Sequence, residues 1–326
     1  MEERQRTRRR GRTRPWSDLE LIMFGIAVLA VFIMTIGRLA GIVKLFDKEP
    51  EEKPTTVVTI GDETGENDPE TEGEEDNEGD VAESTMDYDL YQYADHEGAA
   101  GKIYAHMEAY PEAAYVLRNL DLYPEDLLTF VARFPEAMSY AASYLDFDRM
   151  NIQQEIDLSQ EVTLGEIPLL IQWDTRWGYV TYGDGMIGYT GCGPTCLSMV
   201  SIYYNGWSNN DPAAIAKFAE ANGYYVNGSG SSWTLMSQAS VNFGLSASEV
   251  ILDENAMAKA LGEGKPVICA MGPGVFTDNG HYIVLTGYEN GAFTIHDPNS
   301  RANSARTWTF SELKSQIKNI WSFTKA

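Results

Sequence analysis

A strongly acidic stretch without hydrophobic periodicity limits where this 326-residue chain can fold. Residues 47–97 contain 20 Asp and Glu against two lysines, which accounts for most of the formal net charge of −24. Such a segment buries too little apolar surface to offset its ordering entropy, and its like charges repel one another. We therefore predict a disordered acidic linker over residues 44–97. Weak binding of divalent cations is the alternative, but the segment lacks the spaced ligands of a calcium loop.

The residues before this linker have the pattern of a membrane anchor. Residues 1–14 carry seven arginines and two glutamates, and residues 21–37 run without a charge. An apolar run of this length crosses a bilayer core if Arg38 reaches the outer interface. We predict a basic cytoplasmic segment over residues 1–18 and a transmembrane helix over residues 19–43, with everything after it outside the cell. A cleaved signal peptide is the alternative, although its apolar region is ordinarily shorter.

Three aromatic-Pro-Glu triplets mark the region after the linker. They are Tyr110-Pro111-Glu112, Tyr123-Pro124-Glu125 and Phe134-Pro135-Glu136, and each precedes a short apolar stretch. Proline is favoured at the first helical position, and an acidic residue in the first turn suits the helix dipole. The pattern predicts three or four short helices in a small helical region, residues 98–158, which packs on the domain that follows.

From residue 159 to residue 326 the sequence alternates between strand-like and helix-like patterns. Apolar or β-branched runs predict strands at residues 168–172, 266–271, 281–288 and 293–296. Helical patterns occur at residues 194–204, 212–221, 232–243, 255–261 and 311–320. Because the late strands cluster, we expect an α+β domain in which helices pack against an antiparallel sheet.

Two of the three cysteines lie four residues apart in GCGPTCLSMV, residues 191–200, where a glycine-rich turn becomes an apolar helix. Pro194 suits the first helical position, which places Cys192 at or just before the helix N-terminus. Free backbone N–H groups and the helix dipole stabilise a thiolate at such a position. Cys192 is therefore the candidate nucleophile, and Cys196 is a packed helical residue. The alternatives are a small buried role for Cys192 or a strained disulfide to Cys196.

A thiolate nucleophile needs a base, and the chain offers four histidines. Two of them, His281 and His296, flank a predicted hairpin whose turn lies at Glu289 beside Asn290-Gly291. The apolar side chains of the two strands share one face when they pair as follows: Ile283 with Ile295 and Leu285 with Phe293.

Extended by one pair, this register sets His281 beside Asp297 on the same face, and His296 points the other way. A carboxylate next to an imidazole orients a general base and stabilises its charged form. His281 and Asp297 are therefore the candidate base and its partner. The alternative is that His281 ends a strand and Asp297 opens an Asp-Pro-Asn turn.

The stretches that hold these residues resemble a known family. IPLLIQWDTRWGY, IGYTGCGPTCLSMV and KPVICAM followed by GHYIVLTGYENGAFTIHDPNS are similar to the papain-like cysteine peptidases related to the bacteriocin-processing (double-glycine leader) peptidases. The resemblance covers about residues 165–300 and implies a papain-like fold. It implies that Cys192 is the nucleophile, His281 the base, Asp297 its orienting acid and Gln172 an oxyanion-hole donor. For Gln172, a packing role between strand and helix layer remains an alternative.

The combined expectation is a membrane-anchored extracellular cysteine peptidase that hydrolyses peptide bonds. The substrate is a peptide or protein outside the cell, and the loops at residues 228–233 and 271–274 border its cleft. No metal, organic cofactor or nucleic acid is implied, because metal-ligand spacings are absent and the basic start belongs to the anchor. There are two alternatives: a catalytically silent peptide-binding or adaptor module on the cell surface, and an acyl transferase that uses the same triad.

Overall fold

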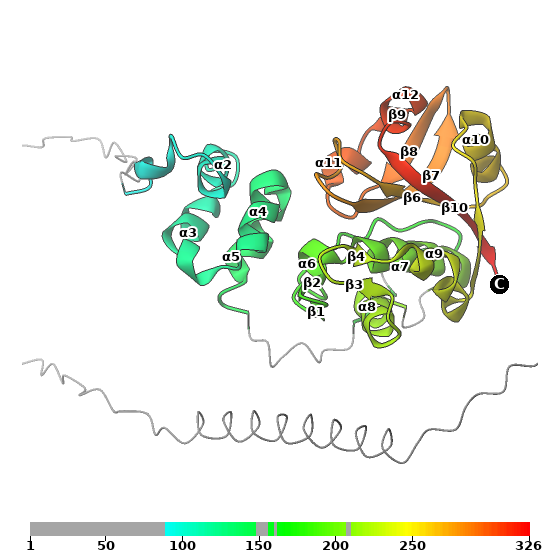
Figure 1. Ribbon diagram of the computed structural model, residues 1–326, viewed down its shortest axis with the longest axis horizontal. Coiled ribbons are helices and arrows are strands. Elements are labelled where there is room, and N and C mark those ends of the chain that lie inside the picture. Colours follow the sequence, from blue (N-terminus) through cyan, green and yellow to red (C-terminus); the bar gives the residue numbers. More distant parts are fainter. Residues whose placement is uncertain (1–88, 148–155, 160–161, 207–209) are drawn as a thin grey trace, which may run out of the picture. The chain divides into compact units, whose positions relative to one another are not determined.

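The computed structural model describes residues 89–147, 156–159, 162–206 and 210–326, which belong to one compact unit, Val81–Ala326 (Figure 1). The predicted cytoplasmic segment, the transmembrane helix over residues 19–43 and most of the acidic linker lie outside the described residues. In the part of the chain that is described, no helix is long and apolar enough to cross a membrane.

Short helices form the first part of the described chain, as the aromatic-Pro-Glu triplets predict. Their bounds are η1 Tyr91–Tyr93, α2 Ala99–Ala105, α3 Ala113–Arg118, η2 Leu120–Leu122, α4 Glu125–Arg133, η3 Pro135–Ala137 and α5 Met138–Ser143. Glu112 is the N-cap residue of α3, and Pro124 is the N-cap residue of α4. Pro135 is the first residue of η3. Each triplet therefore sits at the beginning of a helix.

The helical region shares its hydrophobic core with the segment that follows it. Buried residues of α2 to α5 pack in one cluster with Ile171, Trp173, Tyr179 and Met186. The predicted packing of this region on the following domain is therefore observed. Leu90 is only 2% exposed and belongs to the same cluster, so the ordered helical region begins earlier than residue 98.

An antiparallel sheet of six strands dominates the rest of the described chain. Its strands are β5 Leu245–Glu249, β6 Val267–Met271, β7 His281–Glu289, β8 Ala292–His296, β9 Thr307–Thr309 and β10 Ile317–Lys325. They lie in the order β5-β10-β6-β7-β8-β9. Two small hairpins precede the sheet: β1 Thr181–Tyr182 with β2 Gly185–Met186, and β3 Tyr225–Val226 with β4 Gly230–Ser231.

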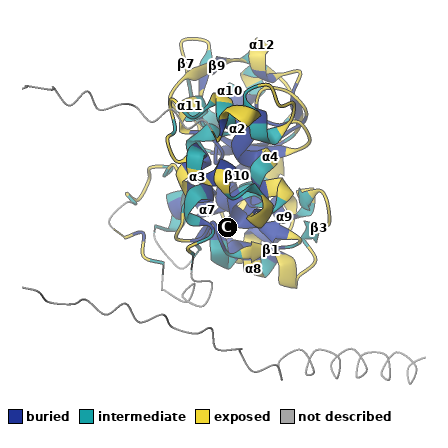
Figure 2. Ribbon diagram, turned by 90° about the vertical axis from the view of Figure 1, so that its left-hand side faces the viewer, coloured by how far each residue is buried: buried dark blue, intermediate teal, exposed yellow. Residues whose placement is uncertain are grey.

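Helices cover both faces of this sheet. Their bounds are α6 Ile187–Thr190, α7 Cys192–Asn205, α8 Pro212–Ala221, α9 Trp233–Ser237, η5 Ala239–Phe243, α10 Glu254–Gly262, α11 Arg301–Ser304 and α12 Phe310–Leu313. Tyr282 and Val284 of β7 pack in the cluster that contains α7 and α8, whereas Ile283 and Leu285 pack in the cluster that contains α10. The strand alternation thus separates two apolar layers, and α7 is almost wholly buried in one of them (Figure 2).

Two of the predicted elements are wrong. Residues 168–172 form no strand and run as an irregular segment. The predicted helix over residues 311–320 stops at Leu313, and its second half begins β10. Trp321 and Phe323 of β10 are buried between β5 and β6, so pairing in the sheet and burial override the helical pattern.

The register of the β7–β8 hairpin also differs from the prediction. Leu285 lies opposite Ile295 instead of Phe293, a shift of two residues, and a bulge follows Leu285. The turn is the two-residue segment Asn290-Gly291, whose φ angles of 52° and 79° fit a type I′ turn. Because side chains alternate with a period of two, a two-residue shift leaves the residues before the bulge on their predicted face.

Candidate active site

Cys192 lies at the start of the long buried helix. Helix α7 begins at Cys192, with Gly191 as the N-cap residue, and Pro194 takes the third helical position instead of the first. The first backbone N–H groups of a helix have no acceptor within it, and the helix dipole is positive at this end. The half-buried sulfur of Cys192 therefore lies at the positive end of the helix dipole, beside backbone N–H groups that have no acceptor within α7.

Two glycines allow the close packing that fixes this helix start. A Cβ atom on Gly193 would lie 2.4 Å from Oγ of Ser231 in β4. A Cβ atom on Gly191 would lie 2.7 Å from the backbone oxygen of Ile187 in α6. Neither distance is sterically allowed, so larger residues would displace α7 and the sulfur that it carries.

The other two cysteines are buried thiols. Cys196 is fully buried, and its Sγ donates to the backbone oxygen of Tyr282 at 3.3 Å. Burial raises the pKa of Cys196 well above the ordinary thiol value, and it does the same for Cys269. All three cysteines are free, so the disulfide alternative does not apply. Cys196 is the packed residue that the sequence predicts.

His281 and Asp297 meet across the end of the hairpin. The His281 Nε2 atom lies 2.7 Å from Oδ1 of Asp297, and both side chains are almost completely buried. Burial lowers the pKa of His281, but the Asp297 charge and hydrogen bond, together with a hydrogen bond from Cys192, raise it above its ordinary value. The ring thus lies between the thiol and the carboxylate. Its Nε2 atom contacts Asp297, and its Nδ1 atom does not.

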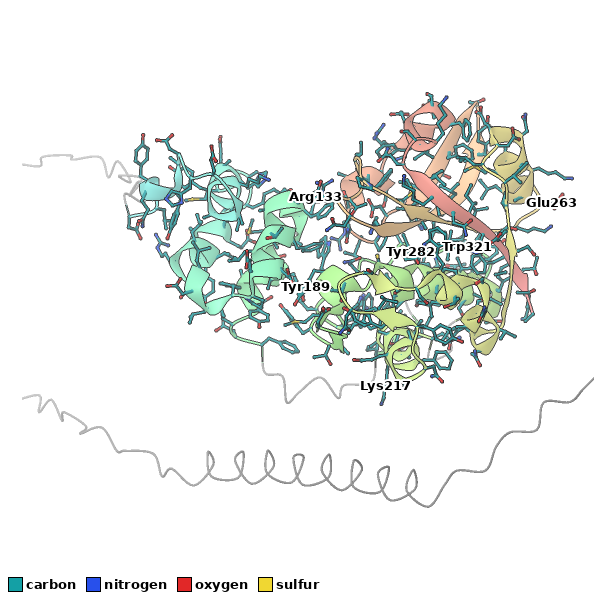
Figure 3. All side chains as sticks on the ribbon, in the orientation of Figure 1. Arg133, Tyr189, Lys217, Glu263, Tyr282 and Trp321 are labelled. Carbon is teal, nitrogen blue, oxygen red and sulfur yellow. The ribbon has the colours of Figure 1, made fainter. Side chains whose placement is uncertain are left out.

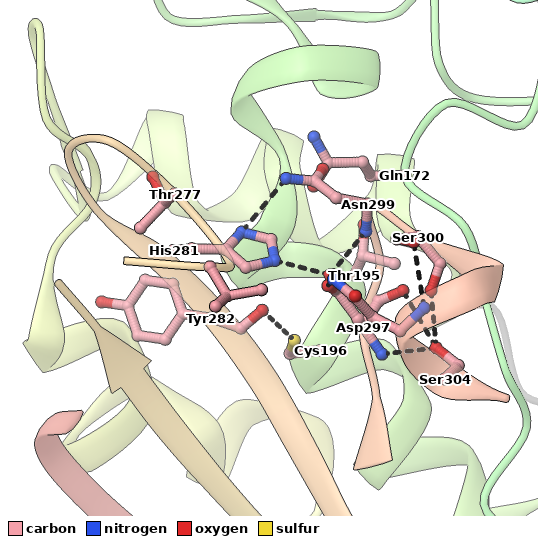
Figure 4. A network of polar contacts seen from close by, with 12 residues as sticks. Gln172, Thr195, Cys196, Thr277, His281, Tyr282, Asp297, Asn299, Ser300 and Ser304 are labelled. Atoms are coloured by element: carbon pink, nitrogen blue, oxygen red, sulfur yellow. Dashed lines mark hydrogen bonds and ion pairs between the residues drawn. The ribbon is translucent and has the colours of Figure 1, made fainter. Parts of the chain in front are cut away.

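A set of hydrogen bonds holds the Asp297 carboxylate in place (Figure 4). Its Oδ1 atom also accepts from the backbone N–H of Asn299 at 2.9 Å, and its Oδ2 atom accepts from Nδ2 of Asn303 at 2.7 Å. The backbone N–H of Asp297 donates to Oγ of Ser304 at 2.9 Å. Such contacts offset the cost of burying a carboxylate and fix its orientation toward His281.

Gln172 reaches the same site from the irregular segment before α6. Its backbone N–H donates to the backbone oxygen of Pro298 at 2.9 Å, which ties this segment to the Asp297 loop. Its Nε2 atom donates to the backbone oxygen of Gly188 at 3.1 Å. Within the described residues, the buried Oε1 atom has no hydrogen-bond partner. Gln172 is therefore a buried polar side chain that is tied to the Asp297 loop and to α6.

Asn299 is a site residue that the sequence analysis did not select. Its Nδ2 atom lies 3.5 Å from Nδ1 of His281, and its buried Oδ1 atom has no partner among the described residues (Figure 4). The sequence signal at this position is Asp-Pro-Asn, which predicts a turn. In the structure the turn returns Asn299 to the imidazole ring.

The candidate residues open into a single cleft. Cys192, His281, Gln172 and Asn299 line a cavity of about 700 Å³. Residues 228–230, 273 and 277–280 border it, so each of the two loops predicted at residues 228–233 and 271–274 supplies part of the wall. Helix α4 of the helical region supplies a further wall. The cleft is therefore built from both parts of the described chain.

Two buried tyrosines near Cys192 are neutral at physiological pH. Burial raises the pKa of Tyr182 and of Tyr282 above the ordinary tyrosine value, and a thiolate at Cys192 would raise both further. Among the described residues, no group of three or more His, Cys, Asp or Glu side chains is arranged to hold a metal ion. The Cys192 thiol and the His281 imidazole line the cleft, and the buried Asp297 carboxylate bonds to the imidazole.

An antiparallel sheet, a central helix that begins with a cysteine, and a His-Asp pair beside that cysteine define the papain-like class of cysteine peptidases. Residues 164–326, half of the chain, match the model of the Peptidase_C39 like family, and the chain belongs to this family. The relationship to the bacteriocin-processing peptidases that the sequence motifs predict is thereby confirmed. Membership implies a cysteine-type peptidase.

Two solved structures are similar to the chain. One is the peptidase domain of Streptococcus ComA, a bifunctional ABC transporter involved in a quorum-sensing pathway, with 20% identity, a TM-score of 0.33, and coverage of 42% of this chain and 91% of that one. The other is a C39-like peptidase from Bacillus anthracis, with 18% identity, a TM-score of 0.30, and coverage of 51% and 98%. No curated protein matches the chain.

Proposed function

We propose that this protein hydrolyses peptide bonds through Cys192, His281 and Asp297. The observation that carries the proposal is the position of the His281 ring. The ring interacts with Cys192 on one side, and on the other side its Nε2 atom lies 2.7 Å from Oδ1 of Asp297, which fixes its orientation. A raised imidazole pKa favours transfer of the thiol proton to His281, which leaves a thiolate paired with an imidazolium.

In the proposed reaction, the Cys192 thiolate attacks the carbonyl carbon of the scissile bond and its electron pair moves to the carbonyl oxygen. Collapse of the tetrahedral intermediate breaks the C–N bond, and the His281 imidazolium gives its proton to the leaving amine. His281 then takes a proton from water, which attacks the thioester. The second collapse releases the carboxylic acid product and restores the thiolate–imidazolium pair.

Two donors are candidates for stabilising the negative oxygen of these intermediates. The first is the backbone N–H of Cys192, which as a first helical N–H has no acceptor within α7. The second is Nε2 of Gln172, which has two hydrogens and uses one of them on Gly188. A donor of this kind contributes about 2.7–4 kcal/mol of transition-state stabilisation.

The location of the enzyme is part of the same proposal. The apolar segment over residues 19–43 would hold the chain in the membrane, with the basic N-terminus in the cytoplasm and the peptidase outside, where it meets peptides or proteins. Protease treatment of intact cells should remove an epitope tag placed after residue 326 and leave an N-terminal tag intact. Protection of both tags would contradict this orientation.

The pH dependence of alkylation at Cys192 tests the catalytic proposal. We expect iodoacetamide to label Cys192 well below pH 8 and much faster than Cys196, as located by mass spectrometry. His281→Ala should abolish this reactivity at low pH. His296→Ala is the matched control, because His296 lies on the same hairpin but contacts the backbone oxygen of Pro168.

The outcomes distinguish the alternatives. Labelling of Cys192 with an ordinary thiol profile, indifferent to His281→Ala, would favour a peptide-binding or adaptor module over an enzyme. If the thiolate is activated, peptide substrates incubated with an added amine separate hydrolysis from acyl transfer. A product that contains the added amine would identify a transferase, and a free carboxylate would identify a peptidase.

A further inference from the structure

A short stretch at the end of α4 contacts both loops that carry the candidate catalytic residues. Arg133, the last residue of α4, bonds to the loop that precedes His281. Glu136, three residues later, bonds to the loop that follows Asp297. Figure 3 labels Arg133 at the end of α4. The helical region thus contacts the loop before His281 and the loop after Asp297 through two residues that lie three positions apart.

Glu136 makes the denser set of contacts. Its Oε1 atom accepts from Oγ of Ser300 at 2.5 Å and from the backbone N–H of Ala302 at 3.3 Å. Its Oε2 atom accepts from the backbone N–H of Arg301 at 2.9 Å. Both oxygens of one carboxylate are therefore used on the segment that begins α11. Hydrogen bonds to a charged acceptor are roughly twice as strong as neutral ones.

The same segment holds Asp297. The side chains of Asn303 and Ser304 in α11 bond to the Asp297 carboxylate and to its backbone N–H, respectively. Oγ of Ser300, which donates to Glu136, also accepts from the backbone N–H of Asn303 at 3.1 Å. A continuous series of hydrogen bonds therefore runs from Glu136 through α11 to Asp297 and, from there, to His281.

Arg133 provides a second contact on the other side of the cleft. Its Nη1 atom lies 2.5 Å from Oδ1 of Asp278, and its Nη2 atom donates to the backbone oxygen of Gly274 at 2.9 Å. This loop leads directly into His281 at the start of β7. The exposed ion pair contributes little energy, but the contact to the backbone oxygen limits the positions that the loop can take.

We propose that Glu136 is a positioning residue of the peptidase, and that the helical region is an integral part of the active site because it holds the Asp297 loop in its working geometry. The inference rests on the proposed function. Glu136 touches neither the sulfur nor the imidazole, so it acts only through Ser300 and α11. Without it, α11 is free to shift, and Asp297 loses its fixed orientation toward His281.

The test uses the full chain and the same alkylation profile of Cys192. Glu136→Gln keeps the size of the side chain but turns an amide N–H₂ toward a donor of the α11 segment. We expect Cys192 labelling at pH 6 to slow by about tenfold. This factor corresponds to a change of about one in the pKa that governs formation of the thiolate. Glu136→Ala should slow it at least as much.

Glu112→Gln is the matched control. Glu112 occupies the same position in another aromatic-Pro-Glu triplet, is exposed, and caps α3 without a side-chain hydrogen bond. The melting temperature is measured for every variant. A purely structural role for Glu136 would lower the melting temperature and leave the labelling profile of the folded protein unchanged, whereas a positioning role moves the profile itself.

Each result bears on the inference. A slowed, shifted profile for Glu136→Gln, with Glu112→Gln like wild type, supports it. A wild-type profile for Glu136→Gln and Glu136→Ala overturns the inference and leaves the peptidase proposal intact. An ordinary thiol profile for the wild-type chain overturns the peptidase proposal and, with it, the positioning role.

Discussion

The substitution Asp297→Asn separates the charge of the orienting carboxylate from its shape. In the structure, Oδ1 of Asp297 faces Nε2 of His281 and Oδ2 accepts from Asn303. An asparagine can keep its oxygen toward His281, while the amide of Asn303 can turn to present its own oxygen to the new N–H₂ group. The fold and the hydrogen bond to the ring are therefore retained, and the negative charge is lost.

The expected magnitude follows from the Coulomb energy of a close pair of opposite charges. Two unit charges about 4 Å apart interact by about 4 kcal/mol at an effective dielectric constant of about 20. This energy corresponds to about three units in the pKa of His281, whose raised value depends on Asp297. Loss of the charge should therefore lower the population of the thiolate–imidazolium pair. The rate of Cys192 labelling at pH 6 should fall with it, by a factor on the order of 100 or more.

The assay is the rate of iodoacetamide labelling at Cys192 between pH 5 and pH 9. Asp126→Asn is the matched control, because it removes a carboxylate that lines the same cleft but is not bonded to His281. If Asp297→Asn and wild type gave coincident profiles, the electrostatic role assigned to Asp297 would be refuted. A profile shifted equally by Asp126→Asn would instead assign the effect to the overall charge of the cleft.

Three further predictions concern turnover, packing and pH. Gln172→Ala should lower kcat by about 10²–10³ on any peptide that the wild type cleaves, and leave Cys192 labelling unchanged, if Gln172 donates to the oxyanion; an equal kcat would remove it from that role. Gly193→Ala should destabilise the fold by about 1–3 kcal/mol in chemical denaturation, because its Cβ would meet Ser231, and Ser231→Gly in the same chain should restore part of the loss. Burial lowers the pKa of His281 in the folded state, but Asp297 and Cys192 raise it by more, to about 10. The protonated ring therefore contributes its full stabilisation below pH 6.5, and this contribution is lost as the pH rises through about 10. The unfolding free energy should fall over that interval in wild type, and a slope unchanged in His281→Ala would contradict the assignment.

The candidate nucleophile and its partners were accessible from sequence because their signals are local. A glycine, a proline and an apolar run around Cys192 are enough to indicate a helix start. The predicted register that pairs His281 with Asp297 is wrong by two residues. The side chains of His281 and Asp297 nevertheless meet, because the face that a strand residue occupies depends only on whether the shift in register is even or odd.

The elements that the sequence patterns did not reveal are those set by long-range pairing. Strand β10 lies between β5 and β6, so its conformation depends on partners that are distant along the chain. Gln172 was expected on a strand but lies on an irregular segment, held by the backbone oxygen of Pro298. Neither contact leaves a periodic trace in the local sequence, and only the three-dimensional structure shows the strand partners of β10 and the position of Gln172 in the cleft.

Glu136 shows the same limit most clearly. The three aromatic-Pro-Glu triplets are equivalent as sequence, and each begins a helix for the same local reasons. Of their glutamates, Glu112 makes no side-chain cap contact, whereas Glu136 bonds to three donors at the start of α11. The difference arises because the third triplet ends at the loop that carries Asp297. A motif that encodes only a helix start has thus acquired, through tertiary packing, a direct connection to the proposed catalytic carboxylate.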